Sequence, residues 1–189
     1  GLGVLHDTSA TALLLSAFGS DQRSPLRLAS AWSLAHLGAA TELRQEVAKD
    51  LNHPDLGLEA HAAEILGIVG HEDQVPALRV KLLSQTDPVV RTAVVAALSS
   101  IGGPDAISAL VEAFDASRTI PGKVEIVLAL GESASSAGAE ALLEILDRSE
   151  YSQVRLAAIQ GLGEAGDSGS LLPLEPFLSS GDPVLRFQS

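Results

Sequence analysis

The stretch RTAVVAALSSIGGPDAISALVEAFD, residues 91–115, contains two apolar stripes separated by Gly102-Gly103-Pro104-Asp105. Apolar residues within each stripe recur at spacings of three and four, which is the pattern of an amphipathic helix packed on one face. A Gly-Gly-Pro-Asp segment is typical of a helix end followed at once by a helix start. Residues 91–115 are therefore predicted to form two helices joined by a tight turn.

This helix pair recurs along the chain with a period of about 32 residues. Steps of this length fall on a leucine each time, at Leu2, Leu34, Leu66, Leu98, Leu130 and Leu162. The residue directly after each leucine is small, and the residues four positions after each leucine are His6, Gly38, Gly70, Gly102, Ala134 and Gly166. Because a helix of about 12 residues is marginal alone, each copy must bury its stripe against its neighbours. The predicted fold class is an all-α, right-handed alpha solenoid of five to six two-helix repeats, forming one domain over residues 1–189.

Turn signals mark where the first helix of a pair begins. Asp87-Pro88 and Asp182-Pro183 each combine a candidate N-cap residue with a proline at the first helical position. Proline is tolerated there because its missing N–H would have no partner within the helix. We therefore expect first helices to start at both places.

Composition excludes several classes of function. The chain carries 24 acidic against 12 basic residues, a net charge of -12, so the basic surface that supplies most nucleic-acid affinity is missing. The absence of cysteine excludes disulfides, thiol catalysis and a Cys-ligated zinc site. No apolar run reaches the roughly 20 residues of a membrane span, so a soluble protein is expected.

The two ends of the sequence do not complete a repeat. GLGVLHD matches the end of a first helix, and GDPVLRFQS matches only the start of another. Solenoids need terminal copies with a polar outer face, so we expect a segment of a longer protein with further repeats on both sides. GLGVLHDTSA also lacks the basic-then-apolar layout of a signal peptide, which favours the cytoplasm.

The pattern D-P-x-V-R-x-x-A-x-x-A-L-x-x-I-G at residues 87–102 resembles HEAT repeats, specifically the short bacterial HEAT-like class also found in phycobilin lyase subunits. The resemblance covers essentially the whole chain. It implies an alpha solenoid that serves in most cases as a protein-binding scaffold and occasionally as an enzyme.

Two enzymatic branches of this class can be compared residue by residue. Deoxyhypusine hydroxylase-like proteins carry His-Glu pairs early in their first helices, where they hold a di-iron site. None of the corresponding pairs here is His-Glu; they are Leu28-Ala29, Ala60-His61, Thr92-Ala93, Val124-Glu125 and Leu156-Ala157. A phycobilin lyase-like pocket would need aromatic and cationic residues, whereas the chain has one Trp and one Tyr.

Other candidate groups have simpler structural explanations. His53, His61 and His71 share no i, i+3 or i, i+4 spacing on one helix, which a helical metal site would need. Glycines within residues 161–169 superficially suggest a dinucleotide loop, but they follow a predicted helix instead of a strand.

A basic residue also recurs at the repeat period, at Arg27, Arg91, Lys123, Arg155 and Arg186, interrupted by Glu59. This row could bind an acidic ligand. It is more simply explained by ion pairs with the aspartates that open first helices, each worth about 0 to 1 kcal/mol when exposed.

Acidic residues are concentrated on two second helices, which in this repeat class are expected to line the concave face. They outnumber Arg148, the single basic residue there, by six to one, and they are Asp105, Glu112, Asp115, Glu140, Glu144 and Asp147. Such a face would favour a basic peptide or helix through complementary potential. The alternative is an ordinary solvated surface that keeps the protein soluble.

The sequence thus predicts a non-catalytic scaffold that binds a protein or peptide along its concave face, and the acidic second helices favour a basic one. No catalytic, cofactor-binding or metal-binding residue is predicted, and neither nucleic acid nor a membrane is an expected partner. The alternative function is a chromophore-handling subunit similar to phycobilin lyases.

Overall fold

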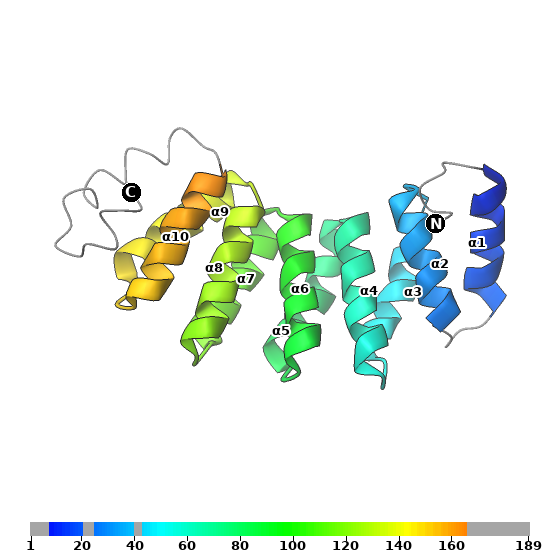
Figure 1. Ribbon diagram of the computed structural model, residues 1–189, viewed down its shortest axis with the longest axis horizontal. Helices are drawn as coiled ribbons and strands as arrows, with labels where there is room; N and C mark the ends of the chain where they lie inside the picture. The colour runs from blue at the N-terminus through cyan, green and yellow to red at the C-terminus, as the bar shows by residue number, and fades with distance from the viewer. Residues whose placement is uncertain (1–7, 21–24, 40–42, 166–189) are drawn as a thin grey trace. The chain divides into compact units, whose positions relative to one another are not determined.

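Figure 1 shows the computed structural model, which describes residues 8–20, 25–39 and 43–165. Within these ranges the chain forms ten α-helices, two short 3-10 helices and no strand. The α-helices are α1 (Thr8–Ser20), α2 (Pro25–His36), α3 (Arg44–Lys49), α4 (Leu56–Val69), α5 (Val75–Ser84), α6 (Pro88–Ile101), α7 (Pro104–Ala116), α8 (Ile120–Glu132), α9 (Ser136–Arg148) and α10 (Ser152–Ala165). The 3-10 helices are η3 (Asp50–Asn52) and η4 (Glu72–Gln74). The predicted all-α solenoid is therefore confirmed.

The helices alternate as the repeat predicts. The first helices of successive pairs, α2, α4, α6, α8 and α10, begin at residues 25, 56, 88, 120 and 152. Each start follows the previous one by 31 or 32 residues, which agrees with the period of the leucines. The second helices α3, α5, α7 and α9 lie between them in the chain.

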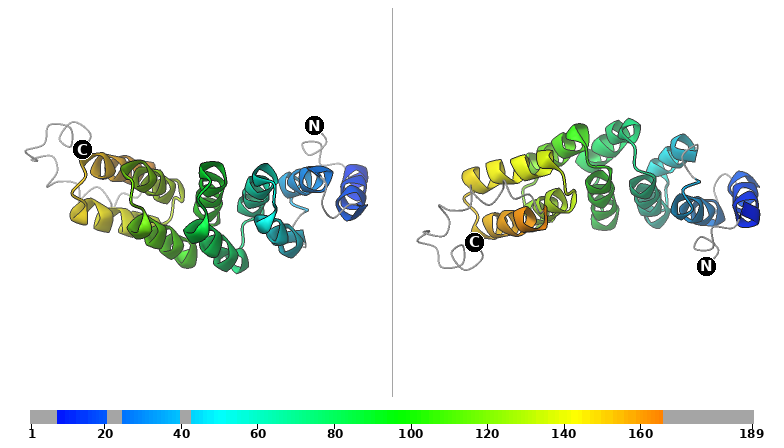
Figure 2. Two further views of the ribbon diagram at one scale, coloured as in Figure 1. Left: turned by 90° about the horizontal axis from the view of Figure 1, so that it is seen from below. Right: turned by 90° about the horizontal axis from the view of Figure 1, so that it is seen from above.

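The chain divides into two compact units, residues 1–97 and residues 98–189. In the first unit α2 packs against both α1 and α4, and α3 packs against α4. In the second unit α8 packs against α10, and α7 packs against α9. Figure 2 shows that in this second unit the first helices form one layer and the second helices form the other.

The repeating leucines form the core. Leu34, Leu66, Leu98 and Leu130 have no exposed surface, and Leu162 is 2% exposed. Leu2 lies outside the described residues. The prediction that these leucines lie at the centre of the stack is confirmed for every described member.

The small residue after Leu66, Leu98 and Leu130 lies where one first helix meets the next. A Cβ atom on Gly67 would lie 2.8 Å from the Cα of Ala97, and one on Gly131 would lie 2.5 Å from the Cα of Gly161. Since real Cβ atoms do not approach that closely, α8 and α10 are in backbone contact at Gly131. At the equivalent position in α6, the hydroxyl of Ser99 donates a 2.7 Å hydrogen bond to the carbonyl of Ala129 instead.

Four positions after Leu34, Leu66, Leu98 and Leu130, the backbone turns out of the helix. Gly38, Gly70 and Gly102 have positive φ values of 69°, 44° and 64°, and Ala134 has a φ of 46°. The left-handed conformation ends a helix and costs an L-residue with a side chain more than it costs glycine. These recurring glycines therefore stop the first helices, as the sequence predicts, and Ala134 does so under strain.

The predicted helix start at Asp87-Pro88 is also confirmed. The carboxylate of Asp87 accepts hydrogen bonds from the backbone N–H groups of Val89 and Val90, at 2.9 and 3.2 Å. Asp55 caps α4 in the same way. The other predicted start, Asp182-Pro183, lies outside the described residues.

Candidate functional site

The six acidic residues predicted as a partner-binding face lie on two neighbouring helices of the second unit. The helix α7 carries Asp105, Glu112 and Asp115, and α9 carries Glu140, Glu144 and Asp147. All are exposed except Glu112, which is half-buried. Because the α9 residues are spaced by four and three, they lie on one face of that helix. We call these six residues the acidic face.

Arg148 partly neutralises the acidic face. Its Nη1 atom lies 2.8 Å from the Oδ1 atom of Asp115, and its Nε atom lies 3.8 Å from the Oε1 atom of Glu144. The guanidinium carbon also lies 5.4 Å from the ring centroid of Phe114, which is a cation–π contact. The uncompensated part of the acidic face is therefore smaller than the six-to-one count of charges suggests.

The remaining acidic side chains are better placed to meet a partner. Within the described part of the chain, no ion pair involves Asp105, Glu140 or Asp147. Glu140 and Asp147 are separated by seven residues, two turns of α9. A binding test can therefore change these two exposed carboxylates together without breaking an ion pair.

The recurring basic position has partners that the sequence did not predict. Arg27 is buried, forms an ion pair with Asp50 and donates a 3.1 Å hydrogen bond to the carbonyl of Glu46. The Nζ atom of Lys123 lies 2.6 Å from the carbonyl oxygen of Phe114. Both side chains contact the end of a second helix, where the carbonyl groups attract cations, and not an aspartate that opens a first helix.

Glu59, which interrupts the basic row, occupies the same position with the opposite charge. It is 3% exposed and forms an ion pair with Lys81 near the end of α5. Gln85 donates a 3.2 Å hydrogen bond to its other carboxylate oxygen. At Arg27, Glu59 and Lys123 the row therefore joins a first helix to the end of a second helix, and the sign of the charge can be reversed together with its partner. Arg186 lies outside the described residues.

A polar hollow of about 460 Å³ lies beside Arg27. Its charged groups pair with one another: Arg27 with Asp50, and Lys49 with Glu46 at 2.7 Å. The hydrogen bond from Lys49 lowers the pKa of Glu46 below its usual value. Because these charges already have partners, the hollow is not a strong candidate for a ligand site.

His53, His61 and His71 do not converge on a common site. His61 and His71 each lie beside a single carboxylate, of Glu64 and Asp73 respectively, and His53 accepts a hydrogen bond from the backbone N–H of Asp55. Among the residues that the structure describes, no group of three or more His, Cys, Asp or Glu side chains could hold a metal ion. No described helix is long and apolar enough to cross a membrane.

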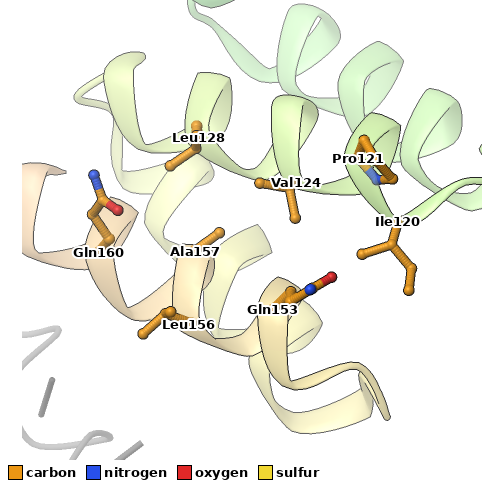
Figure 3. Close-up of a pocket in the computed structure, with 8 residues that line it drawn as sticks. All are labelled: Ile120, Pro121, Val124, Leu128, Gln153, Leu156, Ala157 and Gln160. Atoms are coloured by element: carbon orange, nitrogen blue, oxygen red, sulfur yellow. The ribbon is translucent and has the colours of Figure 1, made fainter. Parts of the chain in front are cut away.

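One feature of the surface was not predicted from the sequence. An apolar groove of about 370 Å³ runs between α8 and α10 (Figure 3). It is lined by Ile120, Pro121, Val124, Leu128, Gln153, Leu156, Ala157 and Gln160. A signal was present, since Ile120, Val124 and Leu128 recur every four residues beside the core stripe that contains Leu130.

Comparisons with known proteins agree with this architecture. Residues 44–131 match the family model for HEAT repeats. Among curated proteins, no sequence is significantly similar to this chain.

Several solved structures share the fold. Human deoxyhypusine hydroxylase in complex with glycerol aligns with a TM-score of 0.53 and 20% identity, over 99% of this chain and 73% of that one. An engineered protein aligns with a TM-score of 0.51 and 21% identity, over 96% of this chain and 94% of that one. The complex of CpcE and CpcF of phycocyanin lyase from Nostoc sp. PCC7120 aligns with a TM-score of 0.53 and 22% identity, over 90% of this chain and 70% of that one.

At these identities the structural likeness concerns the fold alone. The stacked helix pairs, the buried leucines at the repeat period and the match of residues 44–131 all agree. Residues 44–131 are therefore HEAT repeats, and the described chain has the fold of a HEAT-like repeat solenoid.

Proposed function

We propose that the chain is a non-catalytic scaffold that binds a basic segment of another protein along its acidic face. The exposure of Glu140 and Asp147, two turns apart on α9 and outside any ion pair among the described residues, supports this proposal most directly. A surface of like charges lowers the potential around it and steers a positively charged partner toward the binding site.

The helix pairs suit such a role because each repeat contacts only its neighbours and presents its second helix at a regular interval. In the second unit, the buried faces of α7 and α9 include Leu110, Phe114, Leu142 and Leu146, all at most 5% exposed. Their acidic residues therefore project from helices that are fixed by packing, which limits the entropy lost on binding.

The test is a pull-down with this chain as bait, comparing the parent with the double variant E140K/D147K. The matched control is E64K/E72K, which changes the net charge equally at two exposed positions outside the acidic face. A protein that is retained by the parent and the control but lost by E140K/D147K is the expected result. Equal capture by both variants would place binding elsewhere, and loss from both would indicate a response to net charge alone.

A chromophore-handling role is the second candidate, favoured by the likeness of fold to the phycocyanin lyase complex of CpcE and CpcF. Adding a free bilin to the purified chain distinguishes the chromophore-handling role from the scaffold role. A bilin-binding protein would shift the visible absorbance and raise the melting temperature, whereas a scaffold would leave both unchanged.

A further inference from the structure

The apolar groove between α8 and α10 lies on the first helices, whereas the acidic face belongs to the second helices. Figure 3 shows Ile120, Pro121, Val124 and Leu128 along the α8 wall, opposite the α10 wall. Leu156 lies on that opposite wall between Gln153 and Gln160. The backbone contact between Gly131 and Gly161 fixes the two walls relative to each other.

The repeat shows that these apolar residues are not required for stacking. Val124 and Leu128 correspond to Thr92 and Ala96 of α6, because the period is 32 residues. Both α6 residues are exposed and neither is a large aliphatic residue. A first helix of this chain therefore packs without aliphatic side chains at these positions, so their presence on α8 needs another explanation.

Both walls end in a carboxylate. Glu132 lies one turn after Leu128, and Glu164 lies one turn after Gln160, from which it accepts a 3.0 Å hydrogen bond. Glu132 and Glu164 are equivalent residues of successive repeats and both are exposed. The α6 residue at this position is Ser100, so α6 lacks this carboxylate as it lacks the two aliphatic side chains.

We propose that this groove binds the apolar stripe of a basic amphipathic helix from a partner protein. Two parallel walls with an aliphatic lining match the helix-in-groove mode, in which anchors at i, i+3 or i+4, and i+7 enter the groove. The carboxylates of Glu132 and Glu164 then select Lys or Arg one turn beyond the anchors. Gln153 and Gln160 offer amide groups that can hydrogen-bond at the margins.

The test is a selection from a displayed library of helical peptides in which apolar, basic and acidic positions vary. Peptides are kept when they bind the parent but not L128Q/L156Q. The matched control V80Q/L83Q removes two exposed aliphatic side chains from α5, where Val80 is 69% and Leu83 is 44% exposed. The expected peptides carry an aliphatic stripe followed by Lys or Arg, and bind the parent and the control equally.

Two further variants separate the parts of this proposal. E132Q/E164Q is expected to bind the selected peptides about tenfold more weakly than the parent and with a smaller salt dependence. The reason is that the two substitutions remove the negative charges and keep the shape of the side chains. E140K/D147K is expected to bind them as the parent does, so failure of the groove and failure of the acidic face are distinguishable.

Several outcomes would overturn the proposal. One is a selection in which no peptide distinguishes the parent from L128Q/L156Q, and another is enrichment of acidic peptides. Self-association of the parent that L128Q/L156Q abolishes would assign the groove to a second copy of this chain. Binding of a small apolar dye that L128Q/L156Q abolishes, without any selected peptide, would make it a small-molecule site.

Discussion

The two compact units connect their first and second helices by different chemistry. In residues 1–97 two members of the recurring charged position are buried in ion pairs, Arg27 with Asp50 and Glu59 with Lys81. In residues 98–189 the equivalent Lys123 donates to a carbonyl group and lies 4.1 Å from the centroid of the Phe114 ring. The repeat therefore fixes where a charged side chain lies but leaves its sign and partner free.

The largest expected effect comes from breaking a buried pair in the first unit. Asp50→Ala should lower the free energy of unfolding by about 3–5 kcal/mol, because it leaves the Arg27 guanidinium buried without a counter-charge. Urea unfolding followed by circular dichroism measures the loss.

The comparison for this variant is Asp115→Ala in the second unit, which breaks the exposed pair with Arg148. That change should cost about 0–1 kcal/mol, since solvent screens the pair. The reversed pair R27E/D50K, which copies the polarity of Glu59 and Lys81, should recover part of the loss. Equal losses from Asp50→Ala and Asp115→Ala would contradict the difference between the units.

Replacing a core leucine should lower the free energy of unfolding by a similar amount in both units. Leu66→Ala and Leu130→Ala should each cost about 2–5 kcal/mol, because each removes a fully buried side chain and leaves a cavity. Leu13, which is 68% exposed, provides the control, and its replacement by alanine should change stability by less than about 0.5 kcal/mol. Thermal melts of the Leu66 or Leu130 variants that match the parent would show that the leucines are not core.

The glycine contact between α8 and α10 should be sensitive to a single methyl group. Gly131→Ala should destabilise the protein by about 1–3 kcal/mol, because the new Cβ meets the backbone of Gly161. Gly163→Ala in α10, where nothing lies within 4 Å, should stabilise it by about 0.5–1 kcal/mol. Stabilisation by both changes in urea unfolding would mean that the two helices are not in backbone contact.

The smallest effect concerns the helix end at Ala134. Ala134→Gly should stabilise the protein by about 1 kcal/mol, because its φ of 46° is strained for alanine. Gly102→Ala at the equivalent place should be destabilising for the same reason. The melting temperatures of the two variants should move in opposite directions, and a shift in the same direction would argue against the strain.

The helices and the core could be predicted from the sequence because the information is local and repeated. The leucines at positions 34, 66, 98, 130 and 162 mark the core, and Asp87 and Gly102 mark helix ends through their own side-chain and backbone preferences. In a solenoid, contacts join neighbouring repeats, so the period of the sequence is also the period of the stack.

The ion pairs and the groove could not be predicted in the same way. Whether Arg148 is paired with Asp115 depends on how α7 and α9 pack, and the charge count on the acidic face carries no such information. The groove depends on how closely α8 approaches α10 at Gly131 and Gly161. These features arise from geometry between helices, which residue periodicity does not specify.

The most direct test of the scaffold function is the affinity of a partner recovered by the pull-down for three forms of the chain. Fluorescence anisotropy would compare the parent, E140K/D147K and the charge-matched E64K/E72K. We predict that E140K/D147K binds about tenfold more weakly and that E64K/E72K binds within about twofold of the parent. Equal affinity of all three forms would contradict the acidic face as the binding surface.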